Sequence, residues 1–266
     1  MTKDKPTKII PISAFKDNYI WAIHSPDDSE IIVVDHGDAA PVVNYLEQHA
    51  LKLKAILVTH HHWDHSGGIP DLKRYITSVS VYGPAHESTP IAGITQFVDE
   101  GDKIDFPSFG ISFNVMNIPG HTRDHVAYFN EEMLFCGDTL FSCGCGRVFE
   151  GTPTQMLSSL EKLKKLPINT AVFCGHEYTL ANIDFAKVIE PHNADLQLRY
   201  LEAKTARENN LPTLPCTLES ELKINPFLRC EKQSVIDAVR AHIKNDTVSD
   251  PVTIFAHLRE WKNQYR

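Results

Sequence analysis

Short apolar runs separated by turn residues fill the first two thirds of the chain, and no other feature limits its fold as strongly. Each run is too short for an independent helix and is typical of a buried strand. Helical patterns lie between some of them, at Ala40–His49, Asp71–Ile76 and Thr154–Leu163. This mixture predicts an α/β sandwich with helices on its outer faces. The predicted strands are Tyr19–His24, Glu30–Asp35, Ala55–Thr59, Val79–Tyr82, Ile111–Ile118, Val126–Phe129, Met133–Cys136 and Ala171–Cys174.

The character of the sequence changes after about residue 177. Apolar residues now recur at helical spacing, and Pro251 is well placed for a first helical turn. A chain of 266 residues suits one large domain or two unequal ones. We therefore expect a domain over residues 1–176 and a smaller, mainly helical domain over residues 177–266. The predicted helices of the latter are Asp184–Ile189, Asp195–Asn209, Lys232–Ile243 and Pro251–Gln264.

Composition narrows the range of partners and compartments. A formal charge of −8 argues against nucleic acid as the main partner, because phosphate binding needs a basic surface. No apolar stretch approaches the ~20 residues of a membrane span, and residues 1–6 lead into no apolar signal segment. We expect a cytoplasmic monomer with free thiols, since nothing indicates an interface. The six cysteines are Cys136, Cys143, Cys145, Cys174, Cys216 and Cys230.

A histidine-rich run follows the predicted strand Ala55–Thr59 directly. His60, His62, Asp64 and His65 spell His-x-His-x-Asp-His, and imidazole and carboxylate suit zinc, iron or manganese. We expect His61 to be a non-ligand. One extended loop would point alternate residues to opposite sides, so the run must curl to reach two metals. The glycines that follow, Gly67 and Gly68, allow such a turn.

Further ligand types follow other predicted strands, each directly after a glycine. They are His121, Asp138 and His176. Taken singly, each is a weak signal, because a lone histidine is more often structural. Together with the histidine-rich run they give five histidines and two aspartates, which suits two metals with a solvent ligand between them.

These motifs resemble those of the metallo-β-lactamase-fold hydrolases and, within them, the hydroxyacylglutathione hydrolase (glyoxalase II) family. The metal motifs alone indicate only the larger group. The family is indicated by Ala14–Trp21 (Ala-Phe-Lys-Asp-Asn-Tyr-Ile-Trp), Gly144–Arg147 (Gly-Cys-Gly-Arg) and Asn225–Arg229 (Asn-Pro-Phe-Leu-Arg). The resemblance covers nearly the whole chain and implies the αββα sandwich. The remaining matching segments are Thr59–Gly68, Gly120–Thr122, Gly137–Phe141 and Gly175–Tyr178.

The resemblance implies two divalent metal ions, with zinc in first place and iron or manganese as alternatives. His60, His62 and His121 would hold one metal. Asp64, His65 and His176 would hold the other. Asp138 would bridge the two metals, and Asp64 would also orient the attacking hydroxide. Asp64 and Asp138 are thus the implied catalytic residues.

Substrate-binding residues carry over less completely. Arg147 and Phe149 match a basic and an aromatic position just after the Gly-Cys-Gly run. Many members have tyrosine where this chain has Phe149, so one hydroxyl is missing. Tyr178 matches a substrate-contacting tyrosine, and Arg259 and Lys262 match a C-terminal basic pair, which would otherwise be an ordinary solvated helix face. Arginine and lysine would supply local positive charge for a glutathione thioester in an acidic protein.

The implied activity is hydrolysis of 2-hydroxyacylglutathione thioesters, chiefly S-D-lactoylglutathione, to D-lactate and glutathione. This is the second step of methylglyoxal detoxification, performed by a hydroxide that bridges two metal ions. Three alternatives stay open: an iron-dependent persulfide dioxygenase with a one-metal site, a β-lactamase or RNA phosphodiesterase, and a binding protein without catalysis. The full ligand set argues against the first and the last, and the acidic balance offers no support for RNA.

Overall fold

The computed structural model describes residues 7–85 and 88–265, and these form two compact units. The expectation that no signal segment is present rests on residues 1–6, which lie outside the described residues. The first unit comprises the described residues up to Asn117, with Asp124–Asn130 and Leu134–Gly137. The second comprises Ile118–Arg123, Glu131–Met133 and the chain from Asp138 onward.

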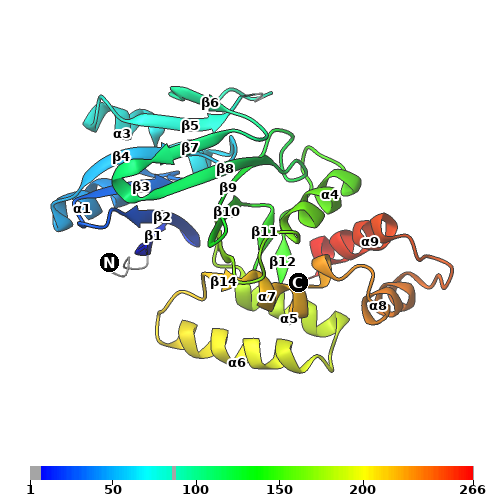
Figure 1. The fold of residues 1–266 in the computed structure, drawn as a ribbon. Helices are drawn as coiled ribbons and strands as arrows, with labels where there is room; N and C mark the ends of the chain where they lie inside the picture. Colours follow the sequence, from blue (N-terminus) through cyan, green and yellow to red (C-terminus); the bar gives the residue numbers. More distant parts are fainter. Residues whose placement is uncertain (1–6, 86–87, 266) are drawn as a thin grey trace. The chain divides into compact units, whose positions relative to one another are not determined.

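The first unit is built on a mixed sheet with helices on one face. Its strands, in sheet order, are β1 (Ile9–Ala14), β2 (Asn18–His24), β3 (Glu30–Val34), β4 (Lys52–Leu57), β5 (Ser80–Pro84) and β6 (Gln96–Val98). β1 to β3 pair antiparallel and β3 to β6 pair parallel (Figure 1). Val42 and Leu46 of α1 (Ala39–His49), with Leu72 of α3 (Ile69–Tyr75), pack against the sheet. Their apolar contacts bury this face from water.

A second sheet layer covers the opposite face within the same unit. It holds β10 (Met133–Gly137), β9 (Val126–Phe129), β8 (Ile111–Asn117) and β7 (Lys103–Phe106), all paired antiparallel in that order. The Tyr128 hydroxyl on β9 donates to the Val58 carbonyl at 2.8 Å, which joins the two layers. The rings of Tyr82 and Phe106 also meet between them, 5.9 Å apart. Two stacked sheets therefore enclose the core that positions the end of β4.

The second unit is mainly helical. A short hairpin of β11 (Leu140–Phe141) and β12 (Gly144–Cys145) precedes α4 (Pro153–Leu163), and β13 (Ala171–Cys174) pairs with β14 (Cys216–Thr217). Asp250 caps the last helix by accepting from the Thr253 N–H, and Pro251 opens its first turn as expected. The other helices are α5 (Thr179–Ile189), α6 (Ala194–Glu208), α7 (Leu218–Ile224), α8 (Gln233–Ile243) and α9 (Pro251–Gln264).

The expected α/β class and its longer elements are confirmed, with ends that differ by a few residues. The expected helix at Asp184–Ile189 begins earlier, at Thr179. Its first turns escape the sequence pattern because the buried polar residues Thr179 and Asn182 interrupt the apolar period. Short elements escaped the sequence pattern. β7 and α7 hold too few apolar residues to establish a period, so tertiary contacts must define them. The elements not expected from sequence include β1, β6, β7, β11, β12, β14, α2 (Trp63–Ser66) and α7.

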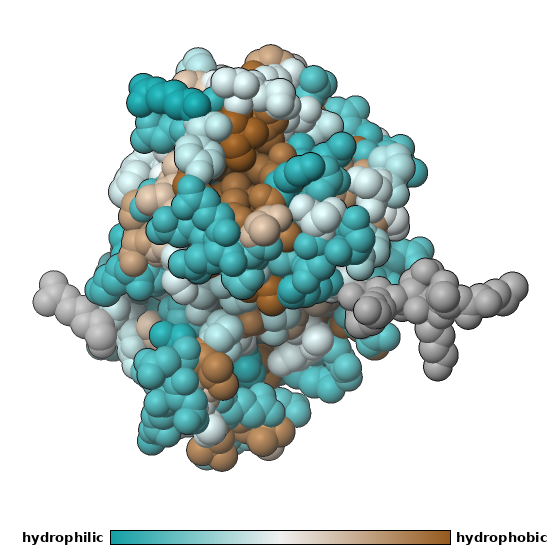
Figure 2. Space-filling view, turned by 90° about the vertical axis from the view of Figure 1, so that its left-hand side faces the viewer, coloured by the Kyte–Doolittle hydropathy of each residue, from teal (hydrophilic) through white to brown (hydrophobic). Residues whose placement is uncertain are grey.

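A hollow lined by both apolar and polar residues opens in the first unit where α1 and α3 end and β4 and β5 begin. It has a volume of about 600 Å³, with Leu46, Leu53 and Ile76 inside and charged groups such as Glu47 and Lys54 around it. Figure 2 shows brown residues in a hollow bordered by teal ones on this side. The described lining contains no histidine or aspartate, so it offers no metal ligands of the expected type. Among residues 7–85 and 88–265, no helix combines the length and apolar character that a membrane crossing requires.

Candidate metal centre and basic pocket

The chain leaves β4 into the histidine-rich run, which the short helix α2 then curls. The N–H groups of His65 and Ser66 donate to the His62 carbonyl, at 2.9 and 3.0 Å. The run is thus folded back by a helical turn, and the expectation of a glycine turn is wrong. Gly67 and Gly68 have ordinary helical φ values of −64° and −76°. Gly68 is needed for a different reason, because a Cβ there would lie 2.7 Å from the His36 carbonyl oxygen.

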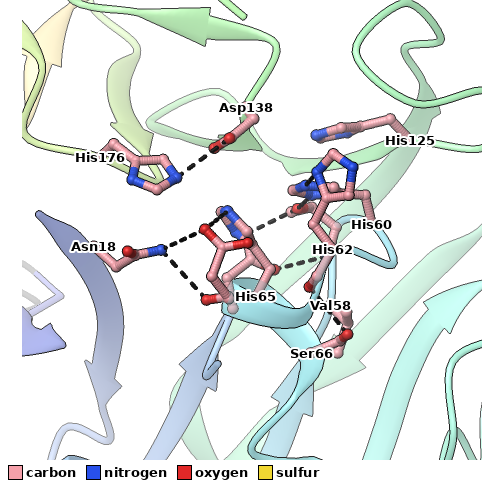
Figure 3. Close-up of polar contacts among 12 residues, drawn as sticks. Asn18, Val58, His60, His62, His65, Ser66, His125, Asp138 and His176 are labelled. Carbon is pink, nitrogen blue, oxygen red and sulfur yellow. Dashed lines mark hydrogen bonds and ion pairs between the residues drawn. The ribbon is translucent and has the colours of Figure 1, made fainter. Parts of the chain in front are cut away.

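The curled run brings the predicted ligand atoms of the first unit close together. His60 Nε2 lies 3.1 Å from His62 Nδ1, and His65 Nε2 lies 3.6 Å from Asp64 Oδ2 (Figure 3). Two donors bound at about 2.0–2.2 Å to one metal are roughly 3.0–3.6 Å apart for ordinary coordination angles. The donor spacing in this unit therefore fits shared divalent metals.

Asp35, at the end of β3, braces these histidines from behind. Its buried carboxylate accepts from the Thr59 N–H and hydroxyl, both at 2.8 Å, and lies 3.1 Å from His65 Nδ1. The Thr59 hydroxyl oxygen lies 3.0 Å from His60 Nδ1. If each Nδ1 carries the proton, each Nε2 keeps its lone pair for a metal, which is the arrangement typical of metal-binding histidines. The first unit therefore holds preoriented imidazoles.

Asn18, at the start of β2, holds the carboxylate of Asp64. Its amide donates to Asp64 Oδ2 at 3.0 Å and to the Asp64 carbonyl at 3.3 Å (Figure 3). Sequence reasoning assigned no role to Asn18, Asp35 or Thr59. Asp35 carried a usable signal, because it directly follows a buried strand as Asp138 does. The role of Asn18 had no such signal, since it depends on a residue 46 positions away.

In the second unit, Asp138 lies between two of the predicted histidine ligands. Its Oδ2 atom is 3.2 Å from His176 Nε2 and 3.6 Å from His121 Nε2. The other ring nitrogen of His121, Nδ1, lies 2.8 Å from the Arg147 carbonyl, which can accept its proton. The ring of Tyr178 stacks on that of His176 with centroids 4.6 Å apart. One carboxylate oxygen beside two imidazoles is the arrangement that a bridging ligand needs.

A pocket of about 470 Å³ in the second unit gathers every residue predicted to bind substrate. Phe149 is 60% exposed there, so its ring is available to a ligand. The lining also includes the predicted metal ligands His121 and Asp138. A ligand in this pocket therefore lies beside part of the metal-binding group. The predicted substrate residues among its lining are Arg147, Phe149, Tyr178, Arg259 and Lys262.

Positive charge is concentrated in this pocket. Arg259 is buried and donates to the Cys145 carbonyl at 2.7 Å, so it does not belong to a solvated helix face. Burial, and then the neighbouring Arg259 and Arg147 charges, lower the pKa of Lys262 to about 8. An anionic ligand would relieve this repulsion. The pocket is therefore suited to a molecule that carries carboxylates.

The cysteines do not provide a nucleophile. All six lie within the described residues, where they are buried and form no disulfide. Burial raises the pKa of the Cys145 thiol to about 11 and that of the Cys143 thiol well above its usual value. Both thiols are protonated at neutral pH and unreactive.

Two family models match consecutive parts of the chain. The metallo-β-lactamase superfamily matches residues 17–176, and the hydroxyacylglutathione hydrolase C-terminus matches residues 177–265. The fold agrees, since ETHE1 from Myxococcus xanthus superposes with a TM-score of 0.62 over 98% of this chain and 100% of its own, at 21% identity. The protein TTHA1623, solved in a di-iron-bound form, gives a TM-score of 0.54 at 25% identity over 63% of this chain and 91% of its own. The protein is thus a metallo-β-lactamase-fold protein of the α/β class.

Curated relatives narrow the class. The hydroxyacylglutathione hydrolase of Nitrosomonas eutropha is 47% identical over 97% of this chain and 99% of its own length. That of Vibrio parahaemolyticus is 50% identical over the same shares. The chain belongs to the hydroxyacylglutathione hydrolase family. Superfamily membership and the histidine and aspartate groups indicate a binuclear site for divalent metals.

Proposed function

We propose that this protein hydrolyses S-(2-hydroxyacyl)glutathione thioesters, chiefly S-D-lactoylglutathione, to a hydroxy acid and glutathione. One observation carries the proposal: a basic pocket has two predicted metal ligands, His121 and Asp138, in its own lining. A glutathione moiety carries carboxylates that Arg147, Arg259 and Lys262 can bind. Membership of the hydroxyacylglutathione hydrolase family supports the substrate class.

We assign the metals to the predicted set of five histidines and two aspartates. His60, His62 and His121 would bind one ion, and Asp64, His65 and His176 the other, with Asp138 shared. Bound metals would supply the Lewis acidity that lowers the pKa of water and polarises the thioester carbonyl. The spacing of the donor atoms within each unit supports this assignment.

The chain's own groups would orient the reaction. Asn18 fixes the Asp64 carboxylate, which would accept a hydrogen bond from the attacking water. The water oxygen bonds to the thioester carbonyl carbon and the carbon–sulfur bond breaks. Both protons of the water pass to solvent, which leaves a carboxylate and a thiolate whose conjugate acid has a pKa of ~8–9. Such a thiolate leaves without strong acid catalysis, so the reaction needs no dedicated general acid.

The proposal is tested by measuring hydrolysis of S-D-lactoylglutathione before and after a chelator, with metal content determined in parallel. We expect turnover that the chelator abolishes and that added divalent metal restores. Absence of turnover by fully metal-loaded protein would exclude the proposed function, and persulfide oxidation would be tested next.

Adjacent histidines provide a matched pair of variants for the ligand assignment. We expect His62→Ala to lose metal and activity, because His62 Nδ1 lies 3.1 Å from His60 Nε2. His61→Ala should keep both, since we assign His61 no ligand role. Equal metal content in the two variants would overturn the assignment.

The identity of the metal, the oligomeric state, the compartment and the domain boundary are also proposals. We infer zinc as the metal in first place, a monomeric cytoplasmic protein, and a catalytic domain over residues 1–176 followed by a substrate-binding domain over residues 177–266. The two family models, which meet between residues 176 and 177, support this division. Metal analysis of protein purified without added metal and measurement of solution mass test the first two points.

A further inference from the structure

A small hairpin in the second unit joins the metal ligands to the basic pocket. β11 and β12 pair Leu140 with Cys145 and Phe141 with Gly144, so Ser142 and Cys143 form the tip. Asp138 precedes the hairpin in the sequence and Arg147 follows it. The position of this hairpin therefore affects both a predicted metal ligand, Asp138, and a predicted substrate-binding residue, Arg147.

Contacts at the base of the hairpin fix these residues. The Gly146 N–H donates to the Thr139 carbonyl at 3.2 Å, and a Cβ on Gly146 would lie only 1.9 Å from the Asp138 carbonyl oxygen. Two main-chain carbonyls that follow β11 contact side chains of the proposed site. The Arg147 carbonyl lies 2.8 Å from His121 Nδ1, and the Cys145 carbonyl accepts a hydrogen bond from Arg259. A shift of the hairpin would move all of these partners.

The tip of the hairpin is held by a buried carboxylate from α7. Glu221 is fully buried, and it accepts from the Ser142 hydroxyl at 3.0 Å and from the Cys143 N–H at 2.7 Å. Cys143 has a φ of +57°, a conformation that is unfavourable for a non-glycine residue. The short hydrogen bond from its N–H to the Glu221 carboxyl oxygen stabilises this conformation.

Asn225, one turn beyond Glu221, holds the two strands of the hairpin. Its side-chain amide lies 3.0 Å from the Phe141 carbonyl, 2.9 Å from the Gly144 carbonyl and 3.0 Å from the Glu221 carboxylate. Asn225 opens the Asn-Pro-Phe-Leu-Arg run, to which the proposed chemistry gives no other role. We call this pair of buried side chains the Glu221–Asn225 clamp.

We propose that the Glu221–Asn225 clamp positions the hairpin so that Asp138 and His121 are set for metal binding and Arg259 for substrate binding. Glu221 and Asn225 are positioning residues, because they act through main-chain groups of the hairpin and touch no proposed ligand atom. The proposal rests on the proposed function for its substrate, but its effect on metal affinity does not.

The test compares two buried glutamates of the second unit. Glu221→Gln keeps the side-chain size and places an N–H₂ group against the donors of the hairpin. Glu190→Gln is the matched control, because the buried Glu190 carboxylate binds Arg229 and Ser234 and makes no described contact with the hairpin. Metal affinity, KM, kcat and melting temperature are measured for both, with S-D-lactoylglutathione as substrate and zinc as metal.

We expect Glu221→Gln to weaken zinc binding and lower kcat/KM by about tenfold each, as displaced partners of metal ligands do. Glu190→Gln should lower the melting temperature without changing zinc affinity or KM. Ser142→Ala removes the hydroxyl that donates to Glu221 at 3.0 Å and accepts from Arg199 at 3.4 Å, and it should shift both quantities about two- to threefold in the same direction. This milder variant keeps the proposal testable if Glu221→Gln does not fold.

Two results would overturn the proposal. One is a folded Glu221→Gln variant with the zinc affinity and KM of the parent protein. The other is a Glu190→Gln variant whose zinc affinity and KM change as much as those of Glu221→Gln when both variants lose the same amount of melting temperature. If the parent protein does not hydrolyse the thioester, the proposed function fails, and zinc affinity alone still decides the role of the clamp.

Discussion

Each unit of the molecule holds its metal-ligand group with a buried carboxylate, but the two carboxylates act at different distances from the ligands. Asp35 in the first unit lies 3.1 Å from the ring of His65, a predicted ligand. Glu221 in the second unit binds Ser142 and the Cys143 N–H, so it reaches the ligands only through the main chain. A direct partner controls the orientation of one ring, whereas an indirect one controls the placement of a whole segment.

This difference follows from how each ligand group is built. In the first unit the predicted ligands follow β4 within one run, and a strand between two packed layers is a rigid support. In the second unit His121, Asp138 and His176 come from three separate segments, so a dedicated clamp is needed to fix one of them. The comparison predicts that direct bracing affects metal affinity more than indirect bracing does.

Among the variants of residues that do not bind metal themselves, Asp35→Asn should have the largest effect. This change places an amide N–H₂ group among donors from Thr59 and His65, and it removes the negative charge that fixes the His65 ring. We expect zinc affinity to fall roughly 10- to 100-fold, beyond the effect of Glu221→Gln. Zinc titration against a competing chelator measures both variants.

Asp38→Asn serves as the control for this prediction. Asp38 lies in the same loop, where its side chain caps α1 by accepting from the Ala40 N–H, and asparagine caps a helix equally well. Its zinc affinity should match that of the parent protein. A smaller effect for Asp35→Asn than for Glu221→Gln would contradict the distinction between direct and indirect bracing.

His36 contrasts with its sequence neighbour Asp35, because its buried side chain supports no predicted metal ligand. Its fully buried ring nitrogens have no hydrogen-bond partner among the described residues, and burial lowers the pKa of His36 to about 4. The unfolded chain therefore binds a proton below pH ~6.5 that the folded chain does not. The contribution of neutral His36 to the free energy of unfolding is therefore fully present above pH ~6.5, and it is lost as the pH falls toward 4.

We expect His36→Leu to remove about 2 kcal/mol of the stability loss between pH 7 and pH 5. Urea unfolding of metal-free protein at the two pH values measures this difference, and the ligand histidines contribute equally to both proteins. His192→Leu, at an exposed position, should leave the pH dependence unchanged. An identical pH dependence for parent protein and His36→Leu would show that His36 is not buried as a neutral ring.

The smallest expected effect concerns the pocket of the second unit. Phe149→Tyr adds a hydroxyl to an exposed ring beside cationic groups. We expect KM for S-D-lactoylglutathione to fall about two- to fivefold with kcat unchanged, as one added hydrogen bond gives. Phe97→Tyr, at another exposed ring outside the pocket, is the control. An unchanged or higher KM for Phe149→Tyr would argue against a substrate contact at this position.

Much of the fold could be predicted because its longer elements carry their own periodic patterns. α6, α8 and α9 were expected within one residue at either end, and the buried strands β2 and β9 were also expected. The hairpin of β11 and β12 could not be predicted, since two-residue strands have no period of their own. Its position depends on Asn225, 84 residues away from Phe141, which no local pattern indicates.

Three properties follow from the amino-acid sequence alone: the types of donor atoms, their place after strands and glycines, and the helical character of the last third. These properties are local, because the periodicity and turn residues of each segment act on that segment alone. Three other properties depend on tertiary contacts. Asp35 contacts the ring of His65, and α2 curls the histidine-rich run. Arg259 is buried against Cys145, 114 residues away. Burial and hydrogen bonding between distant segments depend on the packed chain as a whole, so they are absent from any single stretch of sequence.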